Sequence, residues 1–311
     1  DQLNRFVAGL SYVQGEFHDE AAFAKLGDKL KHATLARHSA HNCLFYLATP
    51  PDAFEPIIFN LKAARLVSPA VDGENWSRVI IEKPFGHDTP SAWQLNGTVH
   101  GAFSESQVFR IDHYLGKETV QNILVFRLGN SIFEPLWNRR YVDHVQISVA
   151  ESIGIESRAG YFDKAGIIRD IVQSHIMQVF ALVAMEPPAS FEASAIRDEK
   201  AKVLRSMRPF ERQELPSRVV RGQYAAGSVG GEAVAGYLQE PGVPANSTTD
   251  TFVALKCFVD NWRWSGVPFY IRAGKRLPKR VTEVSIIFKA PPLALFKQTD
   301  TEGRSPNVLR L

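Results

Sequence analysis

The residues best suited to chemistry lie in one run of nine, Arg110 to Glu118. This nonapeptide holds two carboxylates, a histidine, a tyrosine and two cations. His113 and Lys117 can present positive charge to an anion, and Asp112 can orient a base that another part of the chain supplies. So short a charged run also occurs as a solvated surface turn with local ion pairs. The two interpretations are an anion-binding turn and an ordinary turn.

The elements around the nonapeptide favour the first interpretation. An apolar strand pattern over 107–111 leads into it, and Val120, Ile123 and Leu124 follow with helical spacing. Open α/β sheets bind their ligands outside the carboxyl ends of their strands. A charged turn at such an end is therefore well placed to bind a ligand.

Residues 1–111 alternate short apolar runs with helical patterns, which is typical of βαβ units in a parallel sheet. The predicted strands cover 43–48, 78–81 and 107–111, and the predicted helices cover 21–30, 52–66 and 90–103. We expect a partial NAD(P)-binding Rossmann-like domain over 1–111.

Residues 112–311 follow another pattern. Alternation of apolar and polar residues over 141–151 predicts a half-buried antiparallel strand. We also expect a helix over 167–185 and a surface loop over the Gly-, Ser-, Pro- and Thr-rich residues 222–250. Further strands are predicted over 251–259, 267–271, 281–288 and 306–311. The predicted fold class is α/β plus α+β, with the Rossmann-like part followed by a partial domain, 112–311, that has a large antiparallel sheet and helices.

Bulk composition excludes several classes. The 311 residues carry a net charge of only +3, so a nucleic-acid binder is not expected. The two cysteines, Cys43 and Cys257, have no CxxC spacing and predict buried reduced thiols rather than a metal site. No apolar run approaches the ~20 residues of a membrane span, and no signal peptide is recognisable. We expect a cytoplasmic protein with no membrane partner.

Three further residues can take part in chemistry but have ordinary alternatives. His175 falls in the apolar stripe of the 167–185 helix. It is either a core histidine or an oriented base. Asp170, on the same helix, and Glu151, at a strand end, can accept hydrogen bonds from hydroxyls. They can equally be a helix N-terminal charge and a surface charge.

Lysine and arginine side chains supply candidate anion ligands. The run from Arg272 to Arg280 contains Lys275, and alone it is well explained as a solvated basic turn. Lys83 directly follows a predicted strand within Glu82-Lys83-Pro84, where it can reach a ligand or simply lie exposed.

Taken together these motifs resemble glucose-6-phosphate dehydrogenase. The nonapeptide is the most specific part of the resemblance, and the other parts occur in the family's order and at similar spacing. They are Glu82 to Gly86, Arg158 to Asp163, Arg169-Asp170 with His175, and Arg272 to Lys275.

The resemblance implies roles for the candidate residues. His175 corresponds to the proton acceptor and Asp112 to its orienting partner. The residues that correspond to substrate ligands are His113, Tyr114, Lys117, Glu151, Asp170, Lys275, Arg280 and Lys83; among them Lys275 and Arg280 correspond to phosphate ligands, and Glu151 and Asp170 to ligands of the glucose hydroxyls. On the cofactor side lie Ala48, Pro50, Glu82 and again Lys83.

The implied activity is oxidation of D-glucose 6-phosphate at C1 to 6-phosphoglucono-δ-lactone, with hydride transfer to NADP and with NAD as the alternative cofactor. The implied assembly is a homodimer or homotetramer. The chain has no copy of the family's glycine-rich phosphate loop, and its last residues stop in a strand pattern. We therefore expect a central fragment that lacks both ends of the family's chain and binds NADP weakly.

Two other hypotheses are kept. Dehydrogenases resembling glucose–fructose oxidoreductase also join a Rossmann domain to an antiparallel sheet and use a Glu-Lys-Pro lysine, but their sugars carry no phosphate. The basic residues His113, Lys117, Lys275 and Arg280 favour a phosphorylated substrate instead. The other hypothesis is a catalytically incompetent fragment that binds a sugar phosphate.

Overall fold

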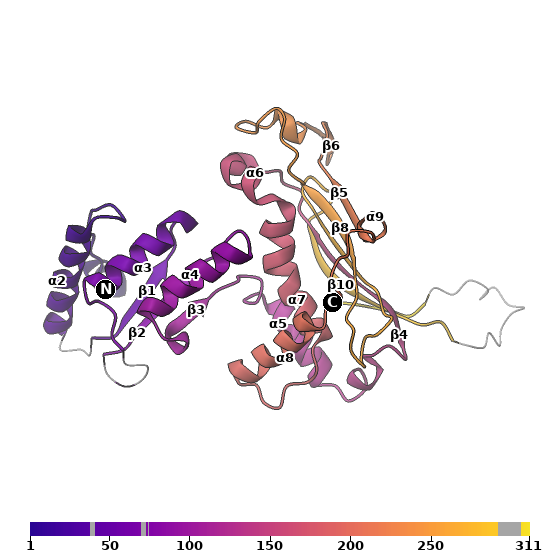
Figure 1. Ribbon diagram of the computed structural model, residues 1–311, viewed down its shortest axis with the longest axis horizontal. Helices are drawn as coiled ribbons and strands as arrows, with labels where there is room; N and C mark the ends of the chain where they lie inside the picture. Colours follow the sequence, from indigo (N-terminus) through magenta and orange to yellow (C-terminus); the bar gives the residue numbers. More distant parts are fainter. Residues whose placement is uncertain (38–40, 70–72, 74, 292–305) are drawn as a thin grey trace, which may run out of the picture. The chain divides into compact units, whose positions relative to one another are not determined.

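A computed structural model describes residues 1–37, 41–69, 73, 75–291 and 306–311 (Figure 1). The chain divides into two units, Asp1–Asp112 and His113–Leu311. The division falls one residue after the expected boundary. Each unit has its own hydrophobic core, and each is described by itself.

Three parallel strands form the centre of the first unit, as the sequence predicts. They are β1 (Cys43–Leu47), β2 (Ser77–Ile81) and β3 (Val108–Arg110), in the order β1-β2-β3. β1 and β2 pair from Cys43↔Ser77 onward, and β2 and β3 pair from Val79↔Val108. Because all three strands run the same way, their carboxyl ends share one edge of the sheet.

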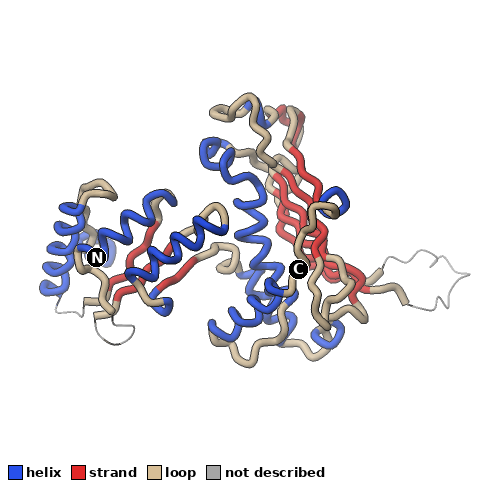
Figure 2. The backbone as a smooth tube through the Cα atoms, viewed as in Figure 1, coloured by secondary structure: helices blue, strands red, loops and turns tan. Residues whose placement is uncertain are grey.

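Helices cover one face of this sheet (Figures 1 and 2). α3 (Phe54–Ala63) follows a short 3-10 turn, and α4 (Thr89–Ala102) begins at an Asp88 N-cap whose side chain accepts from the Ser91 amide. α2 (Glu20–Arg37) packs on α3 and extends well beyond the predicted end at Leu30. The prediction stopped early because the last turns of the helix are polar and show no apolar periodicity. A short exposed helix, α1 (Gln2–Ala8), was not expected.

A six-stranded sheet forms the second unit, in the order β11-β10-β4-β9-β8-β5. Its strands are β4 (Val142–Ala150), β5 (Val219–Gly222), β8 (Phe252–Cys257), β9 (Phe269–Gly274), β10 (Val281–Phe288) and β11 (Val308–Arg310). The sheet is mixed: β4 pairs antiparallel with β10 but parallel with β9, in the register Ala150↔Gly274. The antiparallel expectation for 141–151 thus holds on one side of the strand and is wrong on the other. An alternating pattern reports a half-buried face and does not report the direction of a neighbour.

One face of this sheet is covered by helices, which lie side by side with it in Figure 2. The predicted helix over 167–185 is one part of a longer helical stretch, made of α6 (Ala159–Ile167), a π-helix, η5 (Ile168–Ile176), and α7 (Met177–Ala184). α5 (Glu118–Leu128) and α8 (Ala193–Arg205) pack on α7. The helical stretch begins before the predicted start at Ile167. Gly160 and Gly166 are poor helix formers, so the sequence did not indicate the preceding turns. Gly166 itself has φ 67° and kinks the stretch.

Side chains from elsewhere in the unit cap the carboxyl end of α7. A helix leaves its last four carbonyls without partners inside the helix. Here the carbonyls of 182–185 all accept: Arg127 donates to the first and the fourth, Trp137 to the second and Trp264 to the third. Arg127 is fully buried and also pairs with Glu134 at 3.1 Å. The helix that carries His175 is therefore fixed at its far end.

The predicted loop over 222–250 contains a hairpin, β6 (Gly227–Val229) and β7 (Glu232–Val234). Its two-residue turn is Gly230-Gly231, and both glycines have positive φ, as tight hairpin turns require. A short helix, α9 (Leu215–Arg218), also lay outside the expectations.

Residues Glu156–Ala184 are long and apolar enough to cross a membrane by length and composition alone, contrary to the expectation that no such run exists. In the structure 67% of the apolar window is buried inside the second unit. A core helix passes the same test, and this one packs against β4 and β9.

Candidate functional site

The carboxyl edge of the parallel sheet gathers the predicted cofactor-side residues of the first unit. Ala48 and Pro50 follow β1, and Glu82 and Lys83 follow β2. Glu82 accepts a hydrogen bond of 2.5 Å from the Tyr46 hydroxyl. This edge is the position at which a doubly wound sheet binds a dinucleotide.

One side-chain hydroxyl at this edge can form a hydrogen bond with a ligand. The Thr49 hydroxyl, between Ala48 and Pro50, is buried and makes no hydrogen bond among the described residues. A buried hydroxyl without a partner is unfavourable, and a bound cofactor amide or ribose would relieve the penalty. The residues present therefore fit the end of a dinucleotide that lies at the strand ends.

Within the second unit, His113 and Tyr114 of the nonapeptide lie beside His175. Residues His113 to Gly116 form a turn that leads into α5, whose N-cap is Lys117. The His175 imidazole stacks on the Tyr114 ring at 4.1 Å between centroids, with 16° between the planes. The His113 ring meets the His175 ring edge-on at 4.5 Å. Three rings thus lie together in this unit, while the pairing of His175 with Asp112 stays a prediction.

Lys117 adds positive charge to the ring cluster. Its ammonium nitrogen lies 3.3 Å from the centroid of the Tyr114 ring, a cation–π contact. Tyr114 is 5% exposed whereas His113 is exposed, so the turn keeps one ring in the core and one at the surface. A histidine and a lysine side by side at a partly exposed turn can bind an anionic group.

The π-helical segment explains how one helix contributes both Asp170 and His175. In an α-helix, residues five apart lie about 140° apart around the axis. The i→i+5 hydrogen bonds of a π-helix instead bring residue i+5 close above residue i. Asp170 is 2% exposed and His175 is 1% exposed, so both side chains face the interior of the unit. An α-helical reading of the sequence places His175 in the apolar stripe but leaves Asp170 outside it.

Asp170 contacts two residues of the preceding helical turns. The Tyr161 hydroxyl lies 3.4 Å from Asp170 Oδ1, and Arg158 Nη2 lies 3.9 Å from the same oxygen. The Arg158 guanidinium also stacks over the Tyr161 ring at 5.0 Å. Burial and the neighbouring Asp170 carboxylate raise the pKa of Tyr161 to about 12. The phenol therefore remains a hydrogen-bond donor at neutral pH.

The buried Lys275 and the partly buried Glu151 form an ion pair of 2.6 Å. They follow β4 and β9 directly, and the parallel register Ala150↔Gly274 makes their positions neighbours. The Lys275 ammonium also lies 5.1 Å from the centre of the Phe162 ring. The sequence assigned these two residues to different parts of a substrate, and the structure brings them into one pair.

The structure gives the positions of the remaining predicted residues and does not bear on their roles. Arg280 is exposed and directly precedes β10. Lys83 and Asp112 belong to the first unit. Their roles, like the individual roles of the cluster residues, stay predictions.

Some residues of the site region were missed by sequence reasoning. Tyr161 and Arg158 stood in a quoted motif but received no role. Arg276 was read only as part of a basic run, yet it pairs with Glu240 at 3.1 Å and adopts a positive φ of 54°. Tyr161 lies nine residues before Asp170 in the same helical stretch. A regular α-helix would place such residues on opposite faces, so the sequence carried no signal of their contact.

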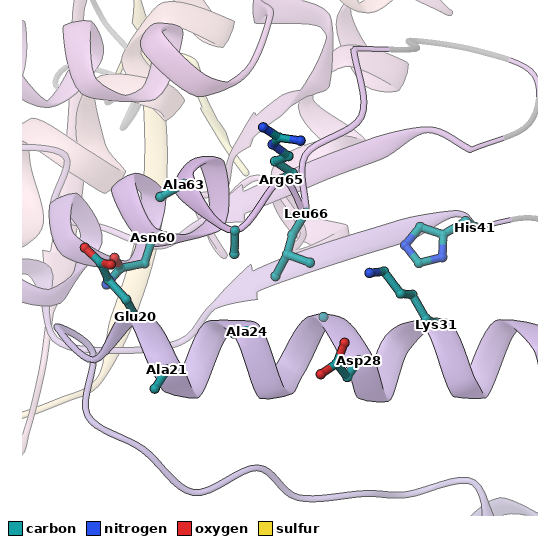
Figure 3. Close-up of a pocket in the computed structure, with 12 residues that line it drawn as sticks. Glu20, Ala21, Ala24, Asp28, Lys31, His41, Asn60, Ala63, Arg65 and Leu66 are labelled. Atoms are coloured by element: carbon teal, nitrogen blue, oxygen red, sulfur yellow. The ribbon is translucent and has the colours of Figure 1, made fainter.

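A cavity of about 630 Å³ in the first unit lies apart from these residues, between α2 and α3 (Figure 3). Glu20 and Asn60 lie at one end of it, and Lys31 and His41 lie at the other. None of the predicted site residues lines this cavity.

The fold and the two groups of residues define a class of protein. A parallel sheet with ligand-suited residues at its carboxyl edge precedes an α+β unit in which His175 is buried beside Tyr114 and His113. A sheet of this kind followed by a second unit is typical of Rossmann-type, dinucleotide-dependent dehydrogenases. The profile of the family "Glucose-6-phosphate dehydrogenase, NAD binding domain" matches residues 1–122. That of "Glucose-6-phosphate dehydrogenase, C-terminal domain" matches residues 124–311. The chain belongs to the glucose-6-phosphate dehydrogenase family.

Individual proteins agree with this membership. Glucose-6-phosphate 1-dehydrogenase of Aggregatibacter actinomycetemcomitans is 48% identical over 302 residues, which cover 97% of this chain and 60% of that protein. The Zymomonas mobilis protein of the same name is 50% identical over 316 residues, covering 100% of this chain and 62% of that protein. A solved structure of glucose-6-phosphate dehydrogenase in complex with its substrate glucose-6-phosphate matches with a TM-score of 0.86 at 37% identity, covering 100% of this chain and 61% of that one. The chain thus spans about three fifths of the length of these relatives.

Proposed function

We propose that this chain carries the substrate site of an NADP-dependent glucose-6-phosphate dehydrogenase. The reaction oxidises C1 of D-glucose 6-phosphate and yields 6-phosphoglucono-δ-lactone. The observation that carries the proposal is the cluster in the second unit, where His175 meets Tyr114 and His113 at 4.1 and 4.5 Å. It combines a buried imidazole with nearby cations, as a reaction that removes a proton from an anionic sugar needs.

His175 is proposed as the base that takes the proton from the C1 hydroxyl. Asp112 is proposed to hold the imidazole in the tautomer that leaves the accepting nitrogen free. NADP, when bound, accepts the hydride from C1. Ala48, Pro50, Glu82 and Lys83 are proposed to hold its nicotinamide end, since they lie at the strand ends. NAD is an alternative cofactor.

The phosphate is proposed to lie against His113 and Lys117. Tyr114, Arg280 and Lys83 complete the expected set of substrate ligands. The resemblance makes Lys275 and Arg280 phosphate ligands as well, but because the Lys275 ammonium pairs with Glu151 at 2.6 Å we propose another role for Lys275. We infer that this pair, with Asp170, holds sugar hydroxyls: the ammonium donates and the carboxylates accept.

A homodimer or homotetramer in the cytoplasm is also proposed. The six-stranded sheet carries exposed apolar side chains, Val220 on β5 and Tyr270 on β9, and the neighbours of Tyr270 along β9, Phe269 and Ile271, are buried. The cysteines are free, which suits a reducing compartment. Light scattering of the purified chain measures its mass, and a monomer at all concentrations contradicts the assembly.

Binding tests the substrate class without requiring turnover. Titration calorimetry compares glucose 6-phosphate, glucose and inorganic phosphate on this chain. We expect glucose 6-phosphate to bind best, and His113→Ala with Lys117→Ala to weaken it by at least tenfold, because two cations are lost. Equal affinity for glucose favours the alternative of a dehydrogenase acting on non-phosphorylated sugars. Exchange of an exposed cation on another element, Lys202→Ala on α8, is the matched control.

Turnover tests the base. NADPH formation is followed in this chain and in the product of the longest reading frame that contains it. His175→Asn should lower kcat by 10²–10⁴-fold and leave glucose 6-phosphate affinity nearly unchanged. A near-normal rate rejects His175 as the base. Substrate binding without turnover in either length, with NADP present, supports the alternative of an incompetent sugar-phosphate-binding fragment.

A further inference from the structure

Asp170 is a buried carboxylate whose direction matters if it accepts a hydrogen bond from the substrate. It is 2% exposed and lies on the π-helical segment with His175. Its Oδ1 faces Tyr161 at 3.4 Å and Arg158 at 3.9 Å. A donor that holds one oxygen of a carboxylate also fixes the direction of the other oxygen. A neighbouring residue can therefore set the geometry of a ligand contact.

Tyr161 is itself held in place from several sides. It stands on α6, where the next residue, Phe162, is buried in the core. The Arg158 guanidinium covers its ring at 5.0 Å. On the far side of α6, Asp163 accepts from the Tyr237 hydroxyl at 2.8 Å and from Ser247, which fixes the helix to the 236–250 segment. The phenol is thus presented to Asp170 by a braced helix.

We propose that Tyr161 is a positioning residue for substrate recognition: its hydroxyl, supported by Arg158, orients Asp170 toward a sugar hydroxyl. The role in recognition rests on the proposed function, whereas the contact between Tyr161 and Asp170 can be tested without substrate. Tyr161 touches neither substrate nor cofactor in this scheme and acts through Asp170.

The first experiment measures the contact itself. The chain is labelled with [ζ-13C]tyrosine, and the phenols are titrated by NMR in the parent and in Asp170→Asn. Removal of the Asp170 charge should lower the pKa of Tyr161 from about 12 and leave the pKa of Tyr237 unchanged. Tyr161→Phe assigns the signal. An unchanged titration of Tyr161 overturns the proposal.

The second experiment measures the consequence for binding. Tyr161→Phe should weaken glucose 6-phosphate by about 3- to 10-fold, the effect of one lost hydrogen bond, and leave inorganic phosphate affinity unchanged. The double variant Tyr161→Phe/Asp170→Asn should bind no more weakly than Asp170→Asn alone, because Tyr161 acts through that residue. Tyr224→Phe, which removes a hydroxyl from the Glu240 carboxylate of the same unit, is the control and should bind like the parent.

The outcomes separate the two proposals. Additive losses, equal losses for phosphate, or no loss in Tyr161→Phe overturn the positioning role. If the parent chain binds phosphate and glucose 6-phosphate equally, the proposed function fails, and a positive first experiment leaves Tyr161 with a structural role only. A merely structural role would lower stability without changing the ratio of the two affinities.

Discussion

At the scale of single residues, the pair Glu151–Lys275 best illustrates how burial changes the importance of a charge. Lys275 is 6% exposed, and its ammonium has one carboxylate at 2.6 Å. Exposed pairs contribute little to stability, but loss of one member of a buried pair leaves a charge that water cannot solvate. The remaining charge, more than the lost attraction, then dominates the cost.

Glu151→Gln should therefore lower the free energy of unfolding of the second unit by about 3 kcal/mol. Urea unfolding is followed by fluorescence in a Trp76→Phe/Trp93→Phe background, which leaves only the tryptophans of the second unit. The double variant Glu151→Gln/Lys275→Met should recover much of the loss, because the unpaired ammonium is gone. A double variant that is less stable than Glu151→Gln contradicts this explanation. The exposed pair Arg208–Asp260 gives the control, Asp260→Asn, with a small change expected.

At the scale of elements, the helical stretch through α6, η5 and α7 positions most of the site. Gly166 kinks it at its start, the π-helical turns bring Asp170 and His175 to one side, and side chains cap its last carbonyls. The cap at the far end depends on Arg127, whose planar fork reaches two carbonyls and the Glu134 carboxylate at once. A lysine has one ammonium and cannot make this set of contacts.

Arg127→Lys should destabilise the second unit by about 3 kcal/mol, because two buried carbonyls and a carboxylate lose donors. The same urea experiment measures the change. Arg221→Lys is the matched control, since Arg221 is exposed and its ion pair with Asp250, at 3.1 Å, lies at the surface. A small effect of Arg127→Lys, close to that of the control, would show that water replaces the missing donors.

At the scale of the molecule, several protons are bound more tightly in the folded second unit than in the unfolded chain. Burial raises the pKa of Cys257 from 9.0 to about 11. Burial, with help from Asp170 and Asp163 respectively, raises the pKa of Tyr161 and of Tyr237 from 10.0 to about 12. The unfolded chain releases these protons first as pH rises, so the folded unit binds more protons between pH 9 and 12. Stability present below pH 9 must therefore fall across that window.

The Cys257 contribution can be isolated. It should cost about 1 kcal/mol at pH 10 compared with pH 8, in proportion to its shift. Cys257→Ala should flatten this part of the pH dependence of urea unfolding, measured with the same fluorescence background. Cys43→Ala, in the first unit, should leave the slope for the second unit unchanged. A slope that is the same with and without Cys257 would assign the alkaline loss to other groups.

The sequence by itself determined the two-part fold class, the parallel sheet with its ligand-suited edge, and the family, because apolar periodicity and contiguous motifs are local properties of a chain. Tertiary structure decided what local patterns do not encode. Alternation along 141–151 indicates burial but not the direction of a neighbour, and the parallel pairing of β4 with β9 is what joins Glu151 to Lys275. A prediction from helical spacing assumes an α-helix. The π-helical segment instead places both Asp170 and His175 in the interior of the unit. In both cases a long-range hydrogen-bonding register, which forms only when the elements pack, sets which side chains meet.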